Sequence, residues 1–149
     1  MIIRRAQAAD AAALNAIVQG SESHKGVYAP MLDGYEITAE QIARDQIHVA
    51  DEGGAVLGFY SLMLGDTPEL DLLFVDDAAQ GRGLGRQLMA HMAQVAAQNG
   101  VTAVKIVSHP PAADFYRGLG AIDVGYAYPM GRVTWVRPIL TLPIGLASD

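Results

Sequence analysis

The chain has 149 residues and a formal charge of -6 at pH 7, with sixteen acidic side chains against ten Lys and Arg. Its balance of 51% hydrophobic and 17% charged residues is typical of one globular domain spanning 1–149 and excludes a disordered chain. The acidic surplus argues against nucleic acid or an anionic membrane as partner, so we expect a neutral or cationic one. The absence of cysteine excludes disulfides, thiolate zinc sites and a cysteine nucleophile.

The sequence predicts no membrane-spanning helix, because such a helix needs about 20 apolar residues in a row. The run 53–65 is a candidate, but it is short and interrupted by glycine. Asp10 interrupts the apolar residues that follow Arg4 and Arg5, which favours a strand leading into a helix over a signal peptide. We therefore expect a cytoplasmic protein with no membrane contact.

The first half of the chain predicts four strands and two helices. Asp10 is placed to cap a helix that ends at Gly20, and Thr38 followed by Gln41 resembles the capping box of a second, brief helix. Between the helices, 21–38 has no hydrophobic period and is expected to form loops and short turns. The strands follow from runs of strand-forming residues, with a hairpin at 52–54 joining the second and third: 2–6, 47–51, 55–64 and 69–75.

The second half begins with a long helix whose apolar residues fall on one face, namely Leu84, Leu88, Met92 and Val95. Asn99-Gly100 ends this helix and a fifth strand follows at 104–108, so the strand–helix–strand order implies locally parallel pairing. A short helix starts at 109–111, and two last strands are expected at 122–128 and 132–142. This order predicts a mixed α/β domain with a central sheet of six or seven strands.

A glycine-rich turn, 80–86, lies between the fourth strand and the long helix. Unpaired backbone N–H groups and the positive end of the helix dipole make such a turn a site for an anion such as phosphate. The glycines let the backbone approach pyrophosphate oxygens, and Arg82 or Arg86 can add charge at the rim. The dinucleotide fingerprint needs a third glycine where Arg86 stands, and the Gly-Lys-Ser or Gly-Lys-Thr of a P-loop is missing. A dinucleotide-dependent oxidoreductase is therefore disfavoured.

Two motifs carry a resemblance to a known family. The turn resembles the acyl-CoA pyrophosphate loop of the GNAT superfamily of N-acetyltransferases, Gln/Arg-x-x-Gly-x-Gly/Ala, and an apolar strand with an acidic turn, 72–76, precedes it. The segment 109–121 is similar to the family's second signature, Asn-x-x-Ala before Phe-Tyr-x-x-Leu-Gly-Phe. Two positions depart from this signature: His109 stands in place of the Asn, and Ala121 stands in place of the last Phe. A hydrogen bond to the CoA arm is therefore either lost or supplied by the imidazole. The matching residues are Gln80, Gly83, Gly85, Ala112, Phe115, Tyr116, Leu119 and Gly120.

The resemblance implies the GNAT fold, a mostly antiparallel central sheet of six or seven strands with a parallel pair at the CoA cleft and about four flanking helices. The strand ending near Val75 is then expected to splay from the next one and admit the pantetheine arm. The implied activity is transfer of the acetyl group of acetyl-CoA, the co-substrate, to a primary amine of a small molecule or peptide by direct attack, with no metal. A homodimer is compatible with the family. The alternative is a non-catalytic CoA-binding or regulatory module with the same fold.

The resemblance also implies site residues. Tyr116 matches the general acid, because a phenol stays protonated at neutral pH and can donate to the thiolate; otherwise it is a core aromatic. Asp71, then Glu69, are candidates for a base on one strand face with Val75, unless both are solvated edge charges. A backbone N–H near Val75 is the expected oxyanion donor. The residues expected to bind the cofactor are Phe74, Val75, Gln80, Gly81, Arg82, Gly83, Leu84, Gly85, Arg86, His109, Ala112 and Phe115.

The other histidines and several aromatic residues are weaker candidates. His24 and His48 are isolated in the sequence, His91 borders an apolar helix face, and no two histidines have metal-ligand spacing. His109 can be a helix cap instead of a cofactor ligand. An acceptor pocket is expected to draw on the irregular segment and the last hairpin, with Tyr28, Tyr35, Glu36, Tyr126, Tyr128, Arg132 and Trp135 as candidates.

Overall fold

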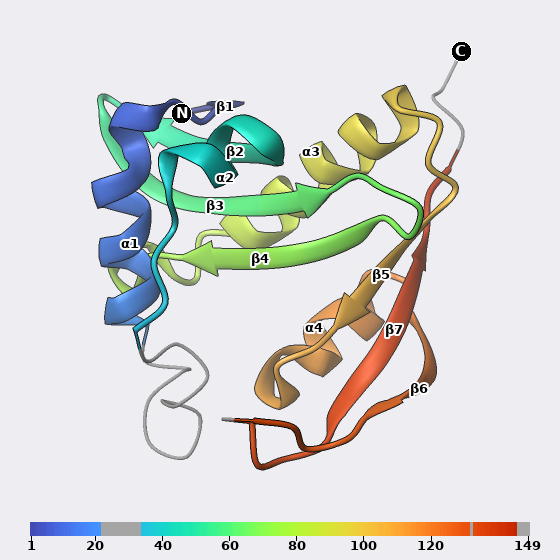
Figure 1. Ribbon diagram of the computed structural model, residues 1–149. Coiled ribbons are helices and arrows are strands. Elements are labelled where there is room, and N and C mark those ends of the chain that lie inside the picture. Colours follow the sequence, from blue (N-terminus) through green and yellow to red (C-terminus); the bar gives the residue numbers. More distant parts are fainter. Residues whose placement is uncertain (22–33, 132, 146–149) are drawn as a thin grey trace.

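The computed structural model describes residues 1–21, 34–131 and 133–145 (Figure 1). Within these residues, seven strands form one sheet in the order β1-β2-β3-β4-β5-β7-β6. The strands are β1 (Ile2–Arg5), β2 (Gln46–Glu52), β3 (Ala55–Met63), β4 (Glu69–Val75), β5 (Ala103–Val107), β6 (Ile122–Ala127) and β7 (Arg137–Pro143). The helices are α1 (Ala11–Gly20), α2 (Ala39–Arg44), α3 (Leu84–Gln98) and α4 (Ala113–Gly118), with short 3-10 turns η1 (Ala8–Asp10), η4 (Asp77–Ala79) and η5 (Pro110–Ala112).

The sheet consists of two antiparallel parts joined by one parallel contact. Strands β1 to β4 follow one another in antiparallel order, and β7 pairs antiparallel with both β5 and β6. The predicted parallel pairing of β4 with β5 is confirmed, and it is limited to Glu69 opposite Lys105. Beyond this pair the two strands diverge (Figure 1). The carboxyl ends of β4 and β5 are therefore not paired with each other.

Helices cover both faces of the sheet. Helices α1 and α2 share one apolar cluster with β2, β3 and β4, and α3 and α4 share the other. The apolar face predicted for α3 is confirmed, because Leu84, Leu88, Met92 and Val95 are all buried. Burying one such side chain stabilises the fold by roughly 2 kcal/mol. None of the helices that the structure describes is long and apolar enough to cross a membrane.

Of the two helix caps predicted from the sequence, the one at Thr38 is present and the one at Asp10 is not. Thr38 caps α2 as expected, because its side chain accepts the N–H of Gln41 at 3.2 Å. Asp10 does not cap α1. Its carboxylate instead binds the guanidinium of Arg4 at 2.9 Å and the N–H of Gln7 at 2.7 Å. Asp10 therefore caps the 3-10 turn η1, which precedes α1, and pairs with Arg4 on β1.

The last strand begins later than predicted, at Arg137 instead of position 132. Met130 and Val133 form an isolated bridge, with N–H···O distances of 2.9 and 3.1 Å in the two directions. The chain therefore closes a tight turn of its own before it pairs with β5. Arg132 lies outside the described residues.

Strand β3 approaches β4 and α3 most closely at Gly58. A Cβ atom there would lie 2.7 Å from the carbonyl oxygen of Phe74, 3.2 Å from Cα of Val75 and 3.3 Å from Cδ1 of Leu88. Real Cβ atoms essentially never come as close to backbone as the first of these distances. Glycine at this position lets the carboxyl end of β4 and the start of α3 pack tightly against the sheet.

Candidate functional site

A cavity of about 390 Å³ lies at the carboxyl ends of β4 and β5, where the strands have diverged. All the site residues predicted from the sequence line it except Glu69 and Arg82. The lining residues that sequence reasoning missed are Ser21, Leu70, Leu72, Leu73, Ala79, Ile106, Val107 and Ser108. The predicted parallel pairing of β4 with β5 could have identified the residues at the end of β5, because ligands bind beyond the carboxyl ends of parallel strands. Nothing in the sequence marks Ser21.

The edge of β4 that borders the cavity offers backbone hydrogen-bonding groups. The N–H of Asp76 bonds to a β3 carbonyl at 2.8 Å, so the preceding residue, Val75, directs its N–H and C=O to the opposite edge. The carbonyl oxygen of Val75 there accepts a hydrogen bond from Nε2 of Gln80 at 3.0 Å. By the same alternation, Leu73 directs its backbone groups toward the cavity. This edge can pair with an extended amide-containing chain.

The glycine-rich turn ends the cavity at the N-terminus of α3. Gly81 and Gly83 have φ angles of 80° and 75°, a left-handed conformation that glycine adopts without a Cβ clash. Gly83 is also the N-cap of α3, so the first N–H groups of this 15-residue helix are not covered by a capping side chain. Gly85 lies against Phe115, since a Cβ atom there would come within 3.2 Å of the ring. The turn therefore presents bare backbone donors and a helix dipole to the cavity.

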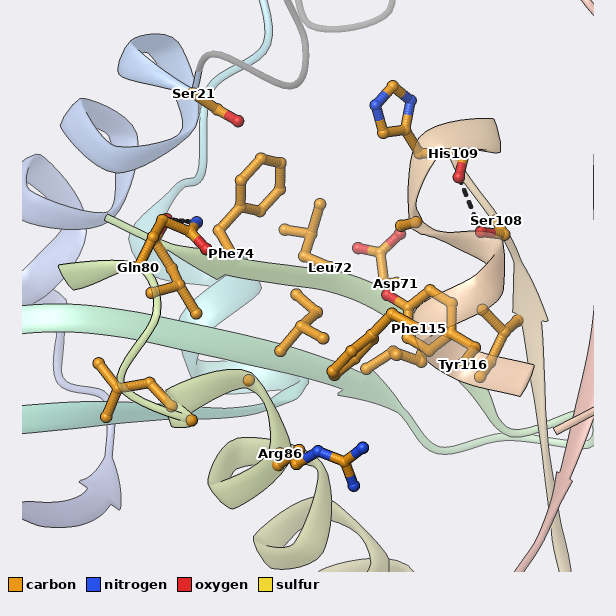
Figure 2. A pocket seen from close by; sticks show the side chains of 18 of the residues that line it. Ser21, Asp71, Leu72, Phe74, Gln80, Arg86, Ser108, His109, Phe115 and Tyr116 are labelled. Carbon is orange, nitrogen blue, oxygen red and sulfur yellow. Dashed lines mark hydrogen bonds between the residues drawn. The ribbon is translucent and has the colours of Figure 1, made fainter. Parts of the chain in front are cut away.

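The two arginines of the turn are placed differently. Arg86 lines the cavity, and its side chain is exposed (Figure 2). Arg82 lies outside the lining, and its Nη2 binds the carboxylate of Glu52, in the β2–β3 hairpin, at 2.7 Å. Arg86 is therefore the better placed of the two to bind an anion in the cavity.

Strand β4 contains a β-bulge in the middle of the cavity wall. In its register with β3, Leu72 stands opposite Ser61 and Leu70 stands opposite Leu62. Asp71 is therefore the extra residue, and the alternation of side chains between the two faces breaks at this point.

The bulge turns Asp71 to the α1 side of the sheet together with Phe74, whereas Val75 packs on the α3 side (Figure 2). The prediction that Asp71 shares a face with Val75 is wrong for this reason. Burial raises the pKa of Asp71, and the nearby carboxylates of Glu69 and Asp45 raise it further. Glu69 lies outside the cavity lining, and its charge contributes to the raised pKa of Asp71.

Tyr116 is packed as a core aromatic residue and also lines the cavity. Its side chain belongs to the core cluster on the α3 side, with 7% of its surface exposed, and its ring meets that of Phe115 edge-on with 5.3 Å between centroids. The hydroxyl nevertheless points into the cavity (Figure 2). Burial raises the pKa of this phenol, so it stays protonated at neutral pH.

His109 stands at the N-cap position of η5, yet its side chain makes no capping hydrogen bond. The helix-cap interpretation is therefore wrong. The imidazole is buried, with 8% exposed, and it lines the cavity. Figure 2 places it on the α1 side, the side on which Ser21 also lies.

Two of the remaining histidines are neighbours. The ring centroids of His48 and His91 are 4.8 Å apart, His48 stacks on Tyr60 at 5.2 Å, and the Tyr60 hydroxyl bonds to Nδ1 of His91 at 2.8 Å. His48 is isolated in the sequence but not in space, because β2, β3 and α3 bring it next to His91. His24 lies outside the described residues.

The residues predicted for an acceptor pocket do not gather at the cavity. Tyr28 and Arg132 lie outside the described residues. The hydroxyl of Tyr35 accepts a hydrogen bond from Gln41 at 3.2 Å next to α2. The other described candidates, Glu36, Tyr126, Tyr128 and Trp135, also lie outside the cavity lining.

Comparisons with known proteins agree with this geometry. The family model described as an acetyltransferase (GNAT) domain matches residues 11–137. A search of curated proteins found no match. Solved structures with the same fold include the PaiA N-acetyltransferase from Thermoplasma acidophilum in complex with coenzyme A, with a TM-score of 0.77, 16% identity, and 95% of this chain and 98% of that chain covered.

Two further structures resemble the chain over nearly its whole length. The ribosomal-protein-alanine N-acetyltransferase from Brucella melitensis has a TM-score of 0.74 and 20% identity, with 96% of this chain and 99% of that chain covered. The structure of yncA from Salmonella typhimurium with its cofactor acetyl-CoA has a TM-score of 0.71 and 24% identity, with 100% and 96% covered. At these identities the likeness shows the fold.

Proposed function

The chain belongs to the GNAT acetyltransferase family, and from this premise we propose that it transfers the acetyl group of acetyl-CoA to a primary amine of a small molecule or peptide. The observation that carries the proposal is the cavity between the diverged ends of β4 and β5. It connects a glycine-rich turn suited to an anion with a buried tyrosine hydroxyl and a partly buried carboxylate. A cysteine-free chain suits direct attack without an acyl-enzyme. We also propose a cytoplasmic location, with which the lack of cysteine is compatible.

The walls of the cavity suit the pyrophosphate and the pantetheine arm of acetyl-CoA. The bare N–H groups at Gly81 and Gly83, together with the dipole of α3, suit the pyrophosphate, and Arg86 adds a positive charge. The backbone groups that Leu73 directs toward the cavity at the edge of β4 suit the amide groups of the pantetheine arm. Phe115 adds an apolar surface beside that edge.

Bound acetyl-CoA supplies an acetyl thioester that an amine can attack directly. The N–H of Val75 points toward the cavity and is placed to donate to the carbonyl oxygen as negative charge develops on it. Tyr116 retains its proton at neutral pH and gives it to the departing thiolate. The carboxylate of Asp71 lies on the opposite side of β4 from the core that holds Tyr116, and it attracts a cationic amine to that side.

The test is a titration with acetyl-CoA followed by an assay of thiol release. We expect heat of binding and a thermal shift with acetyl-CoA, and release of free CoA thiol with at least one member of a panel of small amines and peptides. Peptides with a free N-terminus belong in the panel because one structural neighbour acetylates a ribosomal-protein alanine. No binding of acetyl-CoA would refute the proposal. Binding without turnover across the whole panel would favour the non-catalytic CoA-binding module instead.

A further inference from the structure

The cavity has two sides, and His109 lies on only one of them. The glycine-rich turn, Arg86 and Phe115 gather toward α3, where the helix dipole and the positive charge suit the anionic end of CoA (Figure 2). The α1 side holds a different group of lining residues, namely Ser21, Asp71, Leu72, Phe74 and His109. The imidazole is therefore on the side of the bulge carboxylate, away from the turn that suits the pyrophosphate.

Two hydrogen bonds hold the backbone at His109 in place. The buried hydroxyl of Ser108 donates to the carbonyl oxygen of His109 at 2.8 Å, and the N–H of Ala112 donates to the same oxygen at 2.9 Å. Pro110 and Pro111 follow directly and restrict the backbone further. The backbone of His109 is thus held in place, and the buried side chain lines the cavity before any ligand binds.

The chemistry of an amine acceptor calls for a base on this side. A primary amine is an ammonium ion at neutral pH and must lose a proton before its nitrogen can attack. Among the residues that the structure describes, the charged side chains that line the cavity are Asp71, which is on the same side as His109, and Arg86, which is on the other. A carboxylate attracts the ammonium ion, and an imidazole accepts and releases protons near neutral pH more readily than any other side chain.

We propose that His109 takes up the proton that the acceptor amine releases, and that it acts on the acceptor rather than on the CoA arm. The inference rests on the proposed acetyl transfer and names the base of that reaction. His109 accepts one proton from the ammonium group, the nitrogen–carbon bond forms and the carbon–sulfur bond breaks. Tyr116 gives its hydroxyl proton to the sulfur. The second amine proton restores that hydroxyl through solvent, and His109 returns its own proton to solvent.

The test uses His109→Gln and His109→Asn, which keep a hydrogen-bonding side chain and remove the titratable ring. His91→Gln is the matched control, because it removes a histidine outside the cavity lining. Two quantities are measured for each protein: the dissociation constant of CoA, and kcat/KM for the most active amine of the panel between pH 5.5 and 9. Circular dichroism confirms that each variant is folded.

We expect both His109 variants to bind CoA within about 3-fold of the parent and to lose about 100-fold in kcat/KM. The fall of kcat/KM on the acidic side of the parent's pH profile should be absent from both His109 variants and should persist in His91→Gln. CoA binding weakened 10-fold or more with an unchanged pH profile would overturn the inference and assign His109 to the cofactor arm, and so would unchanged activity with an unchanged profile. A parent that binds acetyl-CoA but releases no thiol with any amine refutes the proposed function, and the inference with it.

Discussion

Replacing His48 with phenylalanine should remove much of the protein's loss of stability in mild acid. His48 stacks on Tyr60, with 5.2 Å between ring centroids, and its Nε2 lies 3.1 Å from Oε1 of Gln46. Its buried Nδ1 has no hydrogen-bond partner among the residues that the structure describes. Phenylalanine keeps the stacked ring in place and cannot take up a proton.

The pKa of His48 is lowered from 6.5 to about 4, first by burial and then by the charges of His91 and Arg5. Between these values the unfolded chain binds a proton that the folded chain does not, so the free energy of unfolding falls as the pH drops through this range. The difference between these two pKa values corresponds to about 3 kcal/mol in the free energy of unfolding. Solvent screens part of it because the ring is only partly buried, and we expect a loss of about 2 kcal/mol between pH 7 and pH 4.5.

The assay is urea unfolding of the parent and His48→Phe at several pH values from 7 to 4.5. Asp10 and Asp51, whose pKa values are lowered by hydrogen bonds from Arg4, titrate in both proteins, and so does Asp71 with its raised pKa. The difference between the two unfolding free energies therefore reports the titration of His48 together with its coupling to His91, whose pKa burial also lowers. It should shift by about 2 kcal/mol in favour of the variant as the pH falls. Parallel curves would refute the reasoning.

Three further predictions concern packing and the cavity. Gly58→Ala should lower the free energy of unfolding by about 2 kcal/mol, because its Cβ would meet the Phe74 carbonyl oxygen at 2.7 Å; an unchanged urea midpoint would contradict this close packing. Tyr116→Phe should lower kcat about 100-fold in the thiol-release assay and leave CoA affinity nearly unchanged, and a variant as fast as the parent would exclude Tyr116 as the acid. Arg86→Ala should raise KM for acetyl-CoA about 5-fold and Arg82→Ala much less, since Arg82 binds Glu52; equal effects would count against the assignment.

The parts of the site that could be predicted are those that local patterns determine. The glycine-rich turn, the amphipathic face of α3 and the bounds of β4 follow from residue spacing within a few turns or one strand. Gln80, Gly83 and Gly85 line the cavity for this reason, and so do Ala112, Phe115 and Tyr116 of the second motif, whereas Leu119 and Gly120 lie outside the lining. The parallel pairing of β4 with β5 also follows from the order of elements, because a strand–helix–strand unit returns the chain in the same direction.

The side of the sheet that Asp71 faces could not be predicted, because it depends on a bulge in the pairing between β3 and β4. Strict alternation within one strand placed Asp71 with Val75, and a single extra residue reverses that relation. The ion pair of Arg82 with Glu52 could not be predicted either, because Glu52 belongs to a hairpin 30 residues away in the chain. The grouping of His48 with His91 depends on the packing of α3 over β2 and β3.

The sequence by itself therefore determined the class of fold, the order of its elements and the place of the glycine-rich turn, since hydrophobic period, turn residues and motif spacing are properties of short segments. Only the tertiary structure decided how the cavity is divided between two sides of the sheet. It placed Asp71 and His109 on the α1 side and Arg86 on the α3 side. The physical reason is that strand register and helix packing join residues far apart in the chain, and a shift of one residue in such a pairing changes the face on which a side chain lies.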